Sequence, residues 1–546
     1  SFDVVGRLPE FQKTYAQGSG GKFSPTSGTS WGPKISELPN DATYGGNTDN
    51  KYTQQYGKQQ GKYYVPQRAS AGLDPWATPQ ADDNAKDFFD TGITWSNSLN
   101  VAQMLEKSSY SISLGNTHQD GIISSTGMDR YNVKVSADTK LTSNWSSGFT
   151  ANYITTSIDK AVTSGNGLLR TVYAAPPSYD LAGIPSHVDG NPYTQNSFRG
   201  SFDNAYWAME NNKFTEDTNR FFGNVYTSYQ TDFGTTNHKL NAKYMVGVDA
   251  YTTHYVDSYG YGSNTGGGRG QIENYGWTNA TYNSLLTINY DWHINEDWGL
   301  NAVVGNEIIQ SNRKKYYEYG TNYNFPGWNH INNATTQQTE EETWKNRTVG
   351  FFGNVSASYR NMLYLTLTGR QDYVSNMPRK NRSFFYPSIS AGFILTELDA
   401  LKNNVVNHAK LRVSYAEVGQ AGDFLENYYS TPTYGGGFYM LTPIMYPMKG
   451  TTAYTPYYTI FDPKLKPQNT RSYEVGADVN FLDNLITFSY TYSRQNVKDQ
   501  IFEVPLASST GASKLLTNGG KIHTNTHEFT LGFNPIRTKN INWDFS

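Results

Sequence analysis

The sequence predicts an all-β fold, a transmembrane antiparallel β-barrel, and three of its features indicate this class. Apolar and polar residues alternate along segments of about 9 to 14 residues, which is the pattern of strands with one apolar and one polar face. Aromatic residues make up 15% of the 546 residues and charged residues only 17%, against about 25% in ordinary soluble domains. No window approaches the roughly 18 apolar residues of a membrane helix, whereas barrel strands are compatible with the mean hydropathy of −0.64.

The first part of the chain differs from the rest. Residues 1–92 are rich in Gly, Ser, Gln, Pro and Tyr and show little periodicity, apart from a possible short strand near Tyr63. We therefore expect residues 1–92 to form a loop-rich early part of the barrel. Residues 93–546 are expected to supply the β-barrel strands and the extracellular loops.

Alternation is clearest in three segments of the second part. In MLYLTLTGRQD, Leu363, Leu365 and Leu367 share one face. Thr366 and Thr368 share the other face, and the segments LLTINYDWHI and LITFSYTYSR alternate in the same way. One face of each strand is thus suited to lipid and the other to water.

Counting such segments predicts about sixteen strands in this chain. They are expected near residues 93, 109, 129, 145, 219, 238, 284, 298, 347, 362, 384, 408, 471, 485, 525 and 540. Short turns are expected at 141–144, 231–237, 295–298, 360–361 and 482–484. Long polar loops are expected at 160–218, 260–283, 319–346 and 421–470. Short periplasmic turns on one rim and long extracellular loops on the other are typical of outer-membrane barrels, whose interfaces also carry Tyr and Trp girdles.

Both ends of the barrel are expected to lie outside this sequence. The chain starts without Met or a leader peptide and ends on INWDFS, which resembles the middle of a strand. Sixteen strands within a longer chain indicate a larger barrel, and barrels of 22 strands have a lumen so wide that it has to be plugged. A plug domain is therefore expected outside this chain.

Aromatic residues in the long loops are the candidate ligand contacts. They stand among Asn and Asp, and exposed rings beside amides and carboxylates suit a glycan or a peptide. The alternative is that these rings pack loop on loop or against a partner protein. The candidates are Tyr173, Tyr179, Tyr206, Trp207, Tyr428, Tyr429, Tyr434 and Tyr439.

The sequence gives little support for nucleic-acid binding, metal binding, phosphate binding or catalysis. The chain has no Cys, and its net charge of −3 gives no electrostatic case for nucleic acid. His523 and His527 are too far apart on a strand, roughly 13 Å, to share one metal ion. The segment 259–271 is glycine-rich but lacks a phosphate-binding Gly-Lys-Ser/Thr, and Asp82, Asp83 and Asp87 fall outside the EF-hand pattern. We expect no catalytic residues, no metal, no cofactor and no enzyme activity.

Several motifs resemble those of one family, the SusC/RagA-like TonB-dependent transporters of the Bacteroidetes outer membrane. They occur in family order over most of the chain, with a departure at Asn204–Trp207, where the family usually has NPYW. The motifs are YAQGSGGKFSPTSGTSWGPKI (15–35), FFDTGITWSNSLNV (88–101), SYSISLGNTHQDGII (109–123), DNAYWAMENN (203–212), GRQDYVSNMPRKNRSFFYPSISAGFILTE (369–397), LRVSYAEVGQAG (411–422) and LKPQNTRSYEVGADVNFLDNLITFSYTYSRQNVKDQI (465–501).

The resemblance implies a 22-stranded barrel in the bacterial outer membrane with an N-terminal plug. It implies coupling to TonB–ExbB–ExbD through the missing N-terminal part, and a SusD-like surface lipoprotein over the extracellular mouth. The implied function is TonB-dependent import of a nutrient, with an oligosaccharide favoured and an oligopeptide second. A passive porin or surface adhesin, and a secreted carbohydrate-active β-protein, are the alternatives.

Overall fold

The structure is a computed structural model of the chain. It describes residues 1–162, 167–401, 403–425, 429–430, 450–451, 455–456, 458–537 and 542–545.

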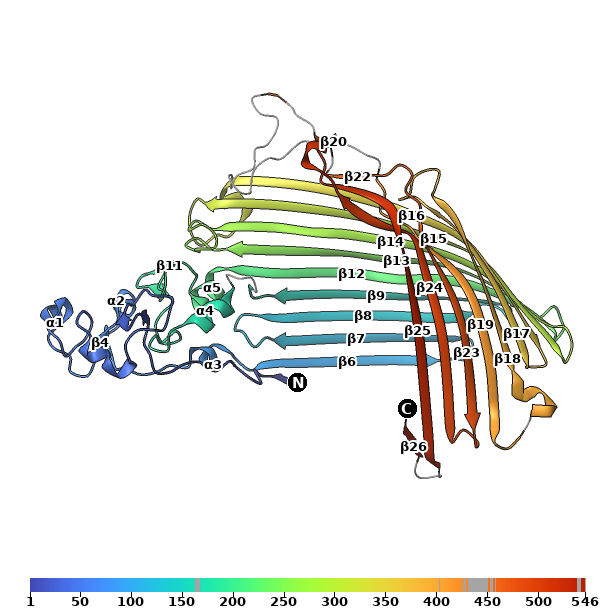
Figure 1. The fold of residues 1–546 in the computed structure, drawn as a ribbon. Helices are drawn as coiled ribbons and strands as arrows, with labels where there is room; N and C mark the ends of the chain where they lie inside the picture. Colours follow the sequence, from blue (N-terminus) through green and yellow to red (C-terminus); the bar gives the residue numbers. More distant parts are fainter. Residues whose placement is uncertain are drawn as a thin grey trace.

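A single large sheet, antiparallel except where the short β22 pairs with β25, dominates these residues (Figure 1). Each of the sixteen strands expected from the sequence is present and pairs with its neighbours along the chain. They are β6 (Gly92–Met104), β7 (Ser108–Asp120), β8 (Gly127–Lys140), β9 (Trp145–Asp159), β12 (Lys213–Thr231), β13 (His238–Tyr259), β14 (Gln271–His293), β15 (Trp298–Tyr323), β16 (Ala334–Tyr359), β17 (Leu363–Val374), β18 (Ser383–Ile394), β19 (Val406–Gln420), β23 (Gln468–Phe481), β24 (Ile486–Pro505), β25 (Lys514–Arg537) and β26 (Asn542–Phe545). Two short strands, β1 (Phe2–Asp3) and β22 (Thr459–Phe461), complete the 18 strands that the described residues contribute to this sheet.

Several strands are longer than the sequence predicts. Strands β15 and β16 each contain 26 residues, whereas about 9 to 11 residues cross a bilayer. The predicted loops 260–283 and 319–346 are therefore largely wrong, because most of their residues continue β14, β15 and β16. Their polar residues occupy strand that projects beyond the bilayer, where both faces meet water.

One face of the sheet carries a continuous apolar band. Leu367 lies directly opposite Val355 on one side and Ile389 on the other, and all three side chains are exposed. Val225 and Val246 continue the band on β12 and β13. Since exposed apolar surface is unfavourable in water, about 25 cal/mol per Å², this outer face is the one that meets lipid. The predicted alternation of apolar and polar faces is confirmed.

The two rims of the sheet differ as predicted. The connections 4–91 and 160–212 leave one rim, which we call the long-loop rim, while the turns 141–144 and 360–362 lie at the other. Aromatic pairs stand at the short-turn rim. For example, the rings of Trp298 and Tyr359 lie 4.6 Å apart at the ends of paired strands, as expected for an interfacial girdle.

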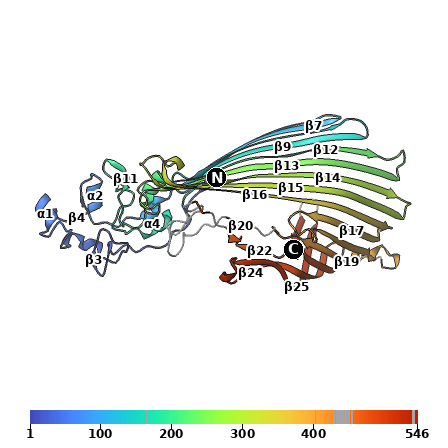
Figure 2. The ribbon, with the colours of Figure 1, turned by 90° about the horizontal axis from the view of Figure 1, so that it is seen from above.

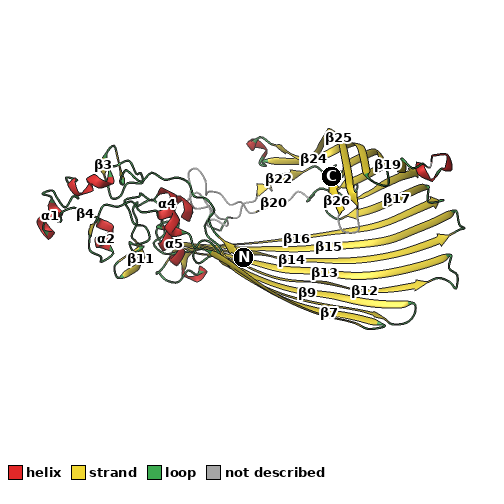
Figure 3. Cartoon of the chain, turned by 90° about the horizontal axis from the view of Figure 1, so that it is seen from below, coloured by secondary structure: helices red, strands yellow, loops and turns green. Residues whose placement is uncertain are grey.

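Residues 4–91 and 160–212 pack into one lobe at the long-loop rim, and the curved sheet extends away from it (Figure 2). Their shared core includes Leu38 and Tyr63 from the first segment and Val172 and Phe198 from the second. Most helical segments gather here (Figure 3). The lobe contains β2 (Gly18–Ser19), β3 (Lys22–Phe23), η1 (Ile35–Asn40), α1 (Lys51–Tyr56), β4 (Tyr63–Tyr64), α2 (Pro66–Ser70), β5 (Trp76–Ala77), α3 (Asn84–Phe88), α4 (Leu168–Ala174), β10 (His187–Val188), β11 (Asn191–Gln195) and α5 (Ala205–Asn211).

The remaining elements are short. They are η2 (Ile331–Asn333), η3 (Leu395–Glu397), η4 (Asp399–Leu401), β20 (Tyr429–Ser430), β21 (Thr455–Pro456) and η5 (Ser508–Thr510). Among the helices in the described residues, none has the length and apolar composition needed to cross a membrane.

Candidate functional site

The face opposite the apolar band, which we call the inner face, is lined by polar and charged side chains. Arg370 on β17 lies 3.0 Å from Glu307 on β15 and 2.8 Å from Asp372 on its own strand. Asp372 is buried and also accepts a 2.5 Å hydrogen bond from the Tyr386 hydroxyl. These groups tie β15, β17 and β18 together through side chains. The inner face is therefore a stiff polar wall, suited to a water-filled path.

A second ionic group lies further along the same face. Arg412 on β19 makes a two-pronged contact with Asp478 on β23, at 2.8 and 3.2 Å. It also donates to the Thr491 hydroxyl on β24 at 2.9 Å. Each charge here is partnered by the wall itself, so these residues stabilise the lining.

The predicted ligand residues of the lobe separate into two kinds. Tyr173 and Tyr206 keep part of their surface exposed, whereas Tyr179 is 2% and Trp207 0% exposed. Burial raises the pKa of the Tyr179 hydroxyl above its ordinary value. Tyr179 and Trp207 are thus packed inside the lobe, and their assignment as ligand contacts stays a prediction. Their packing agrees with the loop-on-loop alternative, because Tyr179 lies in the core shared by the two lobe segments and the Trp207 indole bonds to Pro192 of the same loop.

Asn204 explains why the Asn204–Trp207 segment folds as it does. Its side chain accepts hydrogen bonds from the backbone N–H groups of Tyr206 and Trp207 and so caps α5. The Trp207 indole N–H donates to the Pro192 carbonyl at 2.9 Å. The segment resembling a family motif therefore has a structural role, as cap and core of the lobe.

Tyr173 borders a cavity of about 70 Å³ in the lobe. Its ring and that of Phe11 are both exposed, with centroids 5.8 Å apart. The lining brings together residues far apart in the chain. They are Phe11, Gln12, Lys13, Ser30, Asp82, Asp83, Asn84, Ala85, Val172, Tyr173, Ala175 and Pro177.

The two carboxylates of this cavity differ electrostatically. Lys13 lies 2.8 Å from Asp83, and its hydrogen bond lowers the pKa of that carboxyl. Burial, followed by the nearby Asp180 charge, raises the pKa of Asp82. The cavity thus combines two exposed rings and the Ser30 hydroxyl with two carboxylates, of which Asp83 is paired with Lys13 and Asp82 accepts a hydrogen bond from the Gln80 amide. Such a surface offers acceptors and donors to a polar ligand.

Four predicted ligand residues belong to the loop before β23. Tyr428, Tyr434 and Tyr439 lie outside the described residues. Tyr429 lies in β20, and its side chain also falls outside the description. Their assignment stays a prediction.

The residues that the sequence suggested for metal or phosphate binding lie in a strand and in a hydrogen-bonded turn. His523 and His527 both lie in β25, as their alternating flanks predict. In the glycine-rich segment, Ser263 donates a 2.6 Å hydrogen bond to Asp203, which joins this turn to the lobe. Within the described part of the chain, no three His, Cys, Asp or Glu residues are grouped to hold a metal ion.

Comparisons with known proteins agree with this architecture. The family model described as TonB dependent receptor-like, beta-barrel matches residues 172–546. The TonB-dependent receptor SusC of Bacteroides thetaiotaomicron is 25% identical over 490 residues, which cover 84% of this chain and 46% of SusC. The TonB-dependent receptor P26 of Formosa agariphila is 24% identical over 477 residues, which cover 82% of this chain and 44% of the relative. This chain therefore spans about half the length of these relatives.

Among solved structures, the RagAB peptide importer in its closed-closed state is similar in fold. The TM-score is 0.69 at 15% sequence identity, and the match covers 84% of this chain and 50% of the compared chain. The same importer in its open-open state gives a TM-score of 0.67 at 15% identity, covering 85% and 50%. At this level of identity the likeness establishes the fold alone.

Proposed function

The chain belongs to the TonB-dependent receptor-like β-barrel family of the bacterial outer membrane, and from that premise we propose that the complete protein imports a nutrient with energy delivered through TonB. One observation carries this proposal: the sheet has an apolar outer face and an inner face lined by polar and charged side chains, such as the Arg370 and Arg412 groups. Such a sheet separates lipid from an aqueous path. Import by the complete protein would need a plug and a TonB–ExbB–ExbD connection.

The cargo that we propose first is an oligosaccharide, with an oligopeptide as the second candidate. The lobe cavity supports a polyhydroxylated ligand, because the rings of Phe11 and Tyr173 stand beside the Asp82 and Asp83 carboxylates. A sugar offers apolar ring faces and hydroxyl edges to such groups. The fold shared with the RagAB peptide importer keeps the oligopeptide in consideration.

We propose a SusD-like lipoprotein as the partner at the long-loop rim. The lobe exposes a second aromatic pair there, Tyr15 and Trp31, with ring centroids 5.9 Å apart. Trp31 is 62% exposed. Exposed aromatic residues of this kind are enriched in protein interfaces.

A passive porin or adhesin is the alternative function. It would share the strands and loops but would not need TonB.

Uptake in cells tests the proposal. A strain lacking the gene would be given a mixture of labelled oligosaccharides and a mixture of labelled peptides, and would be compared with the parent and with a tonB mutant. We expect the uptake of one of the two mixtures to fall equally in the gene-deletion strain and in the tonB mutant, relative to the parent strain. Uptake that persists in the tonB mutant but is lost in the gene deletion would indicate a porin instead.

A further inference from the structure

Five aromatic rings lie on the inner face near the long-loop rim, and we call them the aromatic wall. Tyr255, Tyr275 and Tyr317 are directly opposite one another on β13, β14 and β15. The rings of Tyr255 and Tyr275 are stacked, with centroids 4.7 Å apart and an interplanar angle of 7°. Trp277 meets both rings edge-on, at 5.8 and 6.1 Å. Trp344 on β16 completes the set.

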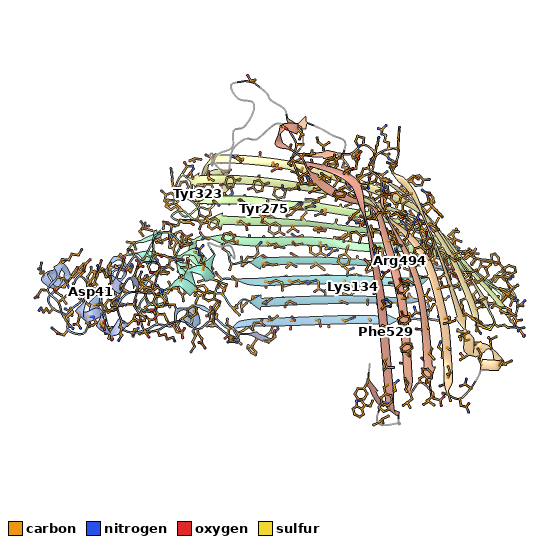
Figure 4. All side chains as sticks on the ribbon, viewed as in Figure 1. Asp41, Lys134, Tyr275, Tyr323, Arg494 and Phe529 are labelled. Carbon is orange, nitrogen blue, oxygen red and sulfur yellow. The ribbon has the colours of Figure 1, made fainter. Side chains whose placement is uncertain are left out.

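A membrane girdle does not explain these rings. On β14, Tyr282 and Leu286 belong to the exposed outer face, and side chains along a strand alternate. Tyr275 and Trp277 are each an odd number of positions from Tyr282 and Leu286, so their side chains belong to the inner face. Figure 4 shows Tyr275 in the part of the sheet nearer the lobe. Interfacial girdles face lipid, whereas the aromatic wall faces the aqueous path.

At two places in the wall, a ring, a carboxylate and an ammonium group come together. The Lys160 ammonium lies 4.6 Å from the Tyr255 ring centroid and 3.5 Å from Glu216. The Lys315 ammonium lies 5.9 Å from the Tyr317 ring centroid and 3.9 Å from Glu340. In both units the cation is attracted by the ring face and by the charge of the carboxylate.

On the side of the wall farther from the long-loop rim, the cation is an arginine, and it is held by two rings. The Arg313 guanidinium lies 5.2 Å from the Trp277 ring centroid and 5.3 Å from that of Trp344. Each flank of the wall therefore contains a cation held against aromatic rings.

The centre of the wall has the ring and the carboxylates but no such cation. The Tyr275 hydroxyl donates to Asp257 Oδ2 at 3.0 Å, and Asp257 lies directly opposite Glu273. Asp257 Oδ1 is buried and receives no hydrogen bond. Among the side chains that the structure describes, no Lys, Arg or His lies within 4.0 Å of either carboxylate. Two like charges directly opposite each other on a sheet are destabilising, and a cation between them would remove that cost.

We propose that the centre of the aromatic wall binds a cationic side chain of the cargo, an ammonium or guanidinium group of a basic oligopeptide. The flanks show which groups fit, because the Lys160 ammonium is held by a ring and a carboxylate and the Arg313 guanidinium by two rings. A lysine or arginine of the cargo would lie beside Tyr275 and between Asp257 and Glu273. This inference rests on the proposed import function, and of its two cargo classes it favours the oligopeptide.

Binding to the purified full-length protein in detergent tests the site. The probes are trilysine, trilysine acetylated at its three side-chain amines, and a glucosamine trimer, measured by isothermal titration calorimetry at low salt. We expect trilysine to bind, acetylated trilysine to bind at least about tenfold more weakly, and the D257N/E273Q variant to lose about tenfold in trilysine affinity. Equal affinities for trilysine and its acetylated form would overturn the proposal.

A matched variant separates the site from general charge effects. Glu341 lies next to Glu340 on β16 but on the opposite face, where it pairs with Lys314 at 2.8 Å. E341Q is therefore expected to bind trilysine like the parent protein. A tenfold loss in E341Q would overturn the assignment to this wall, as would an unchanged affinity in D257N/E273Q.

Two further readouts complete the test. Y275F keeps the ring and is expected to lose less affinity than Y275L, so equal losses would count against the ring. A glucosamine trimer that binds as tightly as trilysine would overturn the assignment to a peptide. Binding in detergent requires neither TonB nor uptake, so a failure of the proposed import function would leave this result unaffected.

Discussion

The hydroxyl oxygens of Thr366 and Ser356 lie 3.0 Å apart across β17 and β16 on the inner face of the sheet. Leu365, one position earlier, points to the opposite face and is 40% exposed. We expect Leu365→Arg to lower the free energy of unfolding by about 2 to 4 kcal/mol where the residue lies near the bilayer midplane, and Thr366→Arg to cost far less. Denaturant titration of protein folded into liposomes measures both. Equal costs would contradict the assignment of the faces.

Arg370 provides a test of the polar lining. Its removal in Arg370→Leu leaves Glu307 and the buried Asp372 without their shared cation. Because uncompensated charges are costly in a partly buried setting, we expect a loss of about 1 to 3 kcal/mol in the free energy of unfolding. Arg360, at an exposed turn 2.9 Å from Asp297, is the matched control. Arg360→Leu is expected to leave the denaturation midpoint unchanged, and equal effects would contradict a special role for Arg370.

The strands could be predicted from the sequence because their signal is local. Alternation in a segment such as MLYLTLTGRQD depends only on neighbouring residues, and all sixteen expected strands are present. The extension of β14 to β16 was missed for a physical reason. Beyond the bilayer both faces of a strand meet water, so its residues need not alternate between apolar and polar. Glu340 and Glu341 were therefore predicted to lie in a loop, although they lie in β16.

The candidate site could be predicted only in part. An aromatic residue in a loop has the same local sequence whether it packs or binds, and the difference between Tyr173 and Trp207 arises from tertiary packing. Phe11 was missed because no local feature brings it to Tyr173. The aromatic wall was missed for the same reason, since Tyr255 and Tyr275 meet only through strand register.

Asp82 makes the stability of the lobe depend on pH. Burial and Asp180 raise its pKa, so its contribution is fully present below the unfolded pKa of about 3.9 and is lost as pH rises through the folded value. Asp82→Asn is therefore expected to slow proteolysis of the lobe at neutral pH, with no gain below about pH 4. Limited proteolysis across this pH range measures the effect.

Asp83 is the control for that series, because its pKa is shifted in the other direction. Lys13 lowers it, so its contribution is present above the unfolded pKa and is lost as pH falls through the folded value. Asp83→Asn should speed proteolysis at neutral pH, where Asp82→Asn slows it. The same direction of change in both variants would contradict the electrostatic assignment.

Substitutions of Trp207 and Tyr173 distinguish a packing role from a ligand-contact role within the lobe. Trp207 is fully buried and its indole N–H is bonded to the Pro192 carbonyl, so Trp207→Ala should destabilise the lobe by about 3 to 5 kcal/mol. Tyr173 is 37% exposed beside the cavity, and Tyr173→Ala should change stability by less than about 1 kcal/mol. If the cavity takes part in cargo capture, Tyr173→Ala lowers the affinity for the imported ligand while hydrogen exchange in α4 stays as in the parent protein. Unchanged affinity in Tyr173→Ala, with intact exchange protection, would remove the cavity from the capture step and leave the barrel wall as the place where cargo is selected.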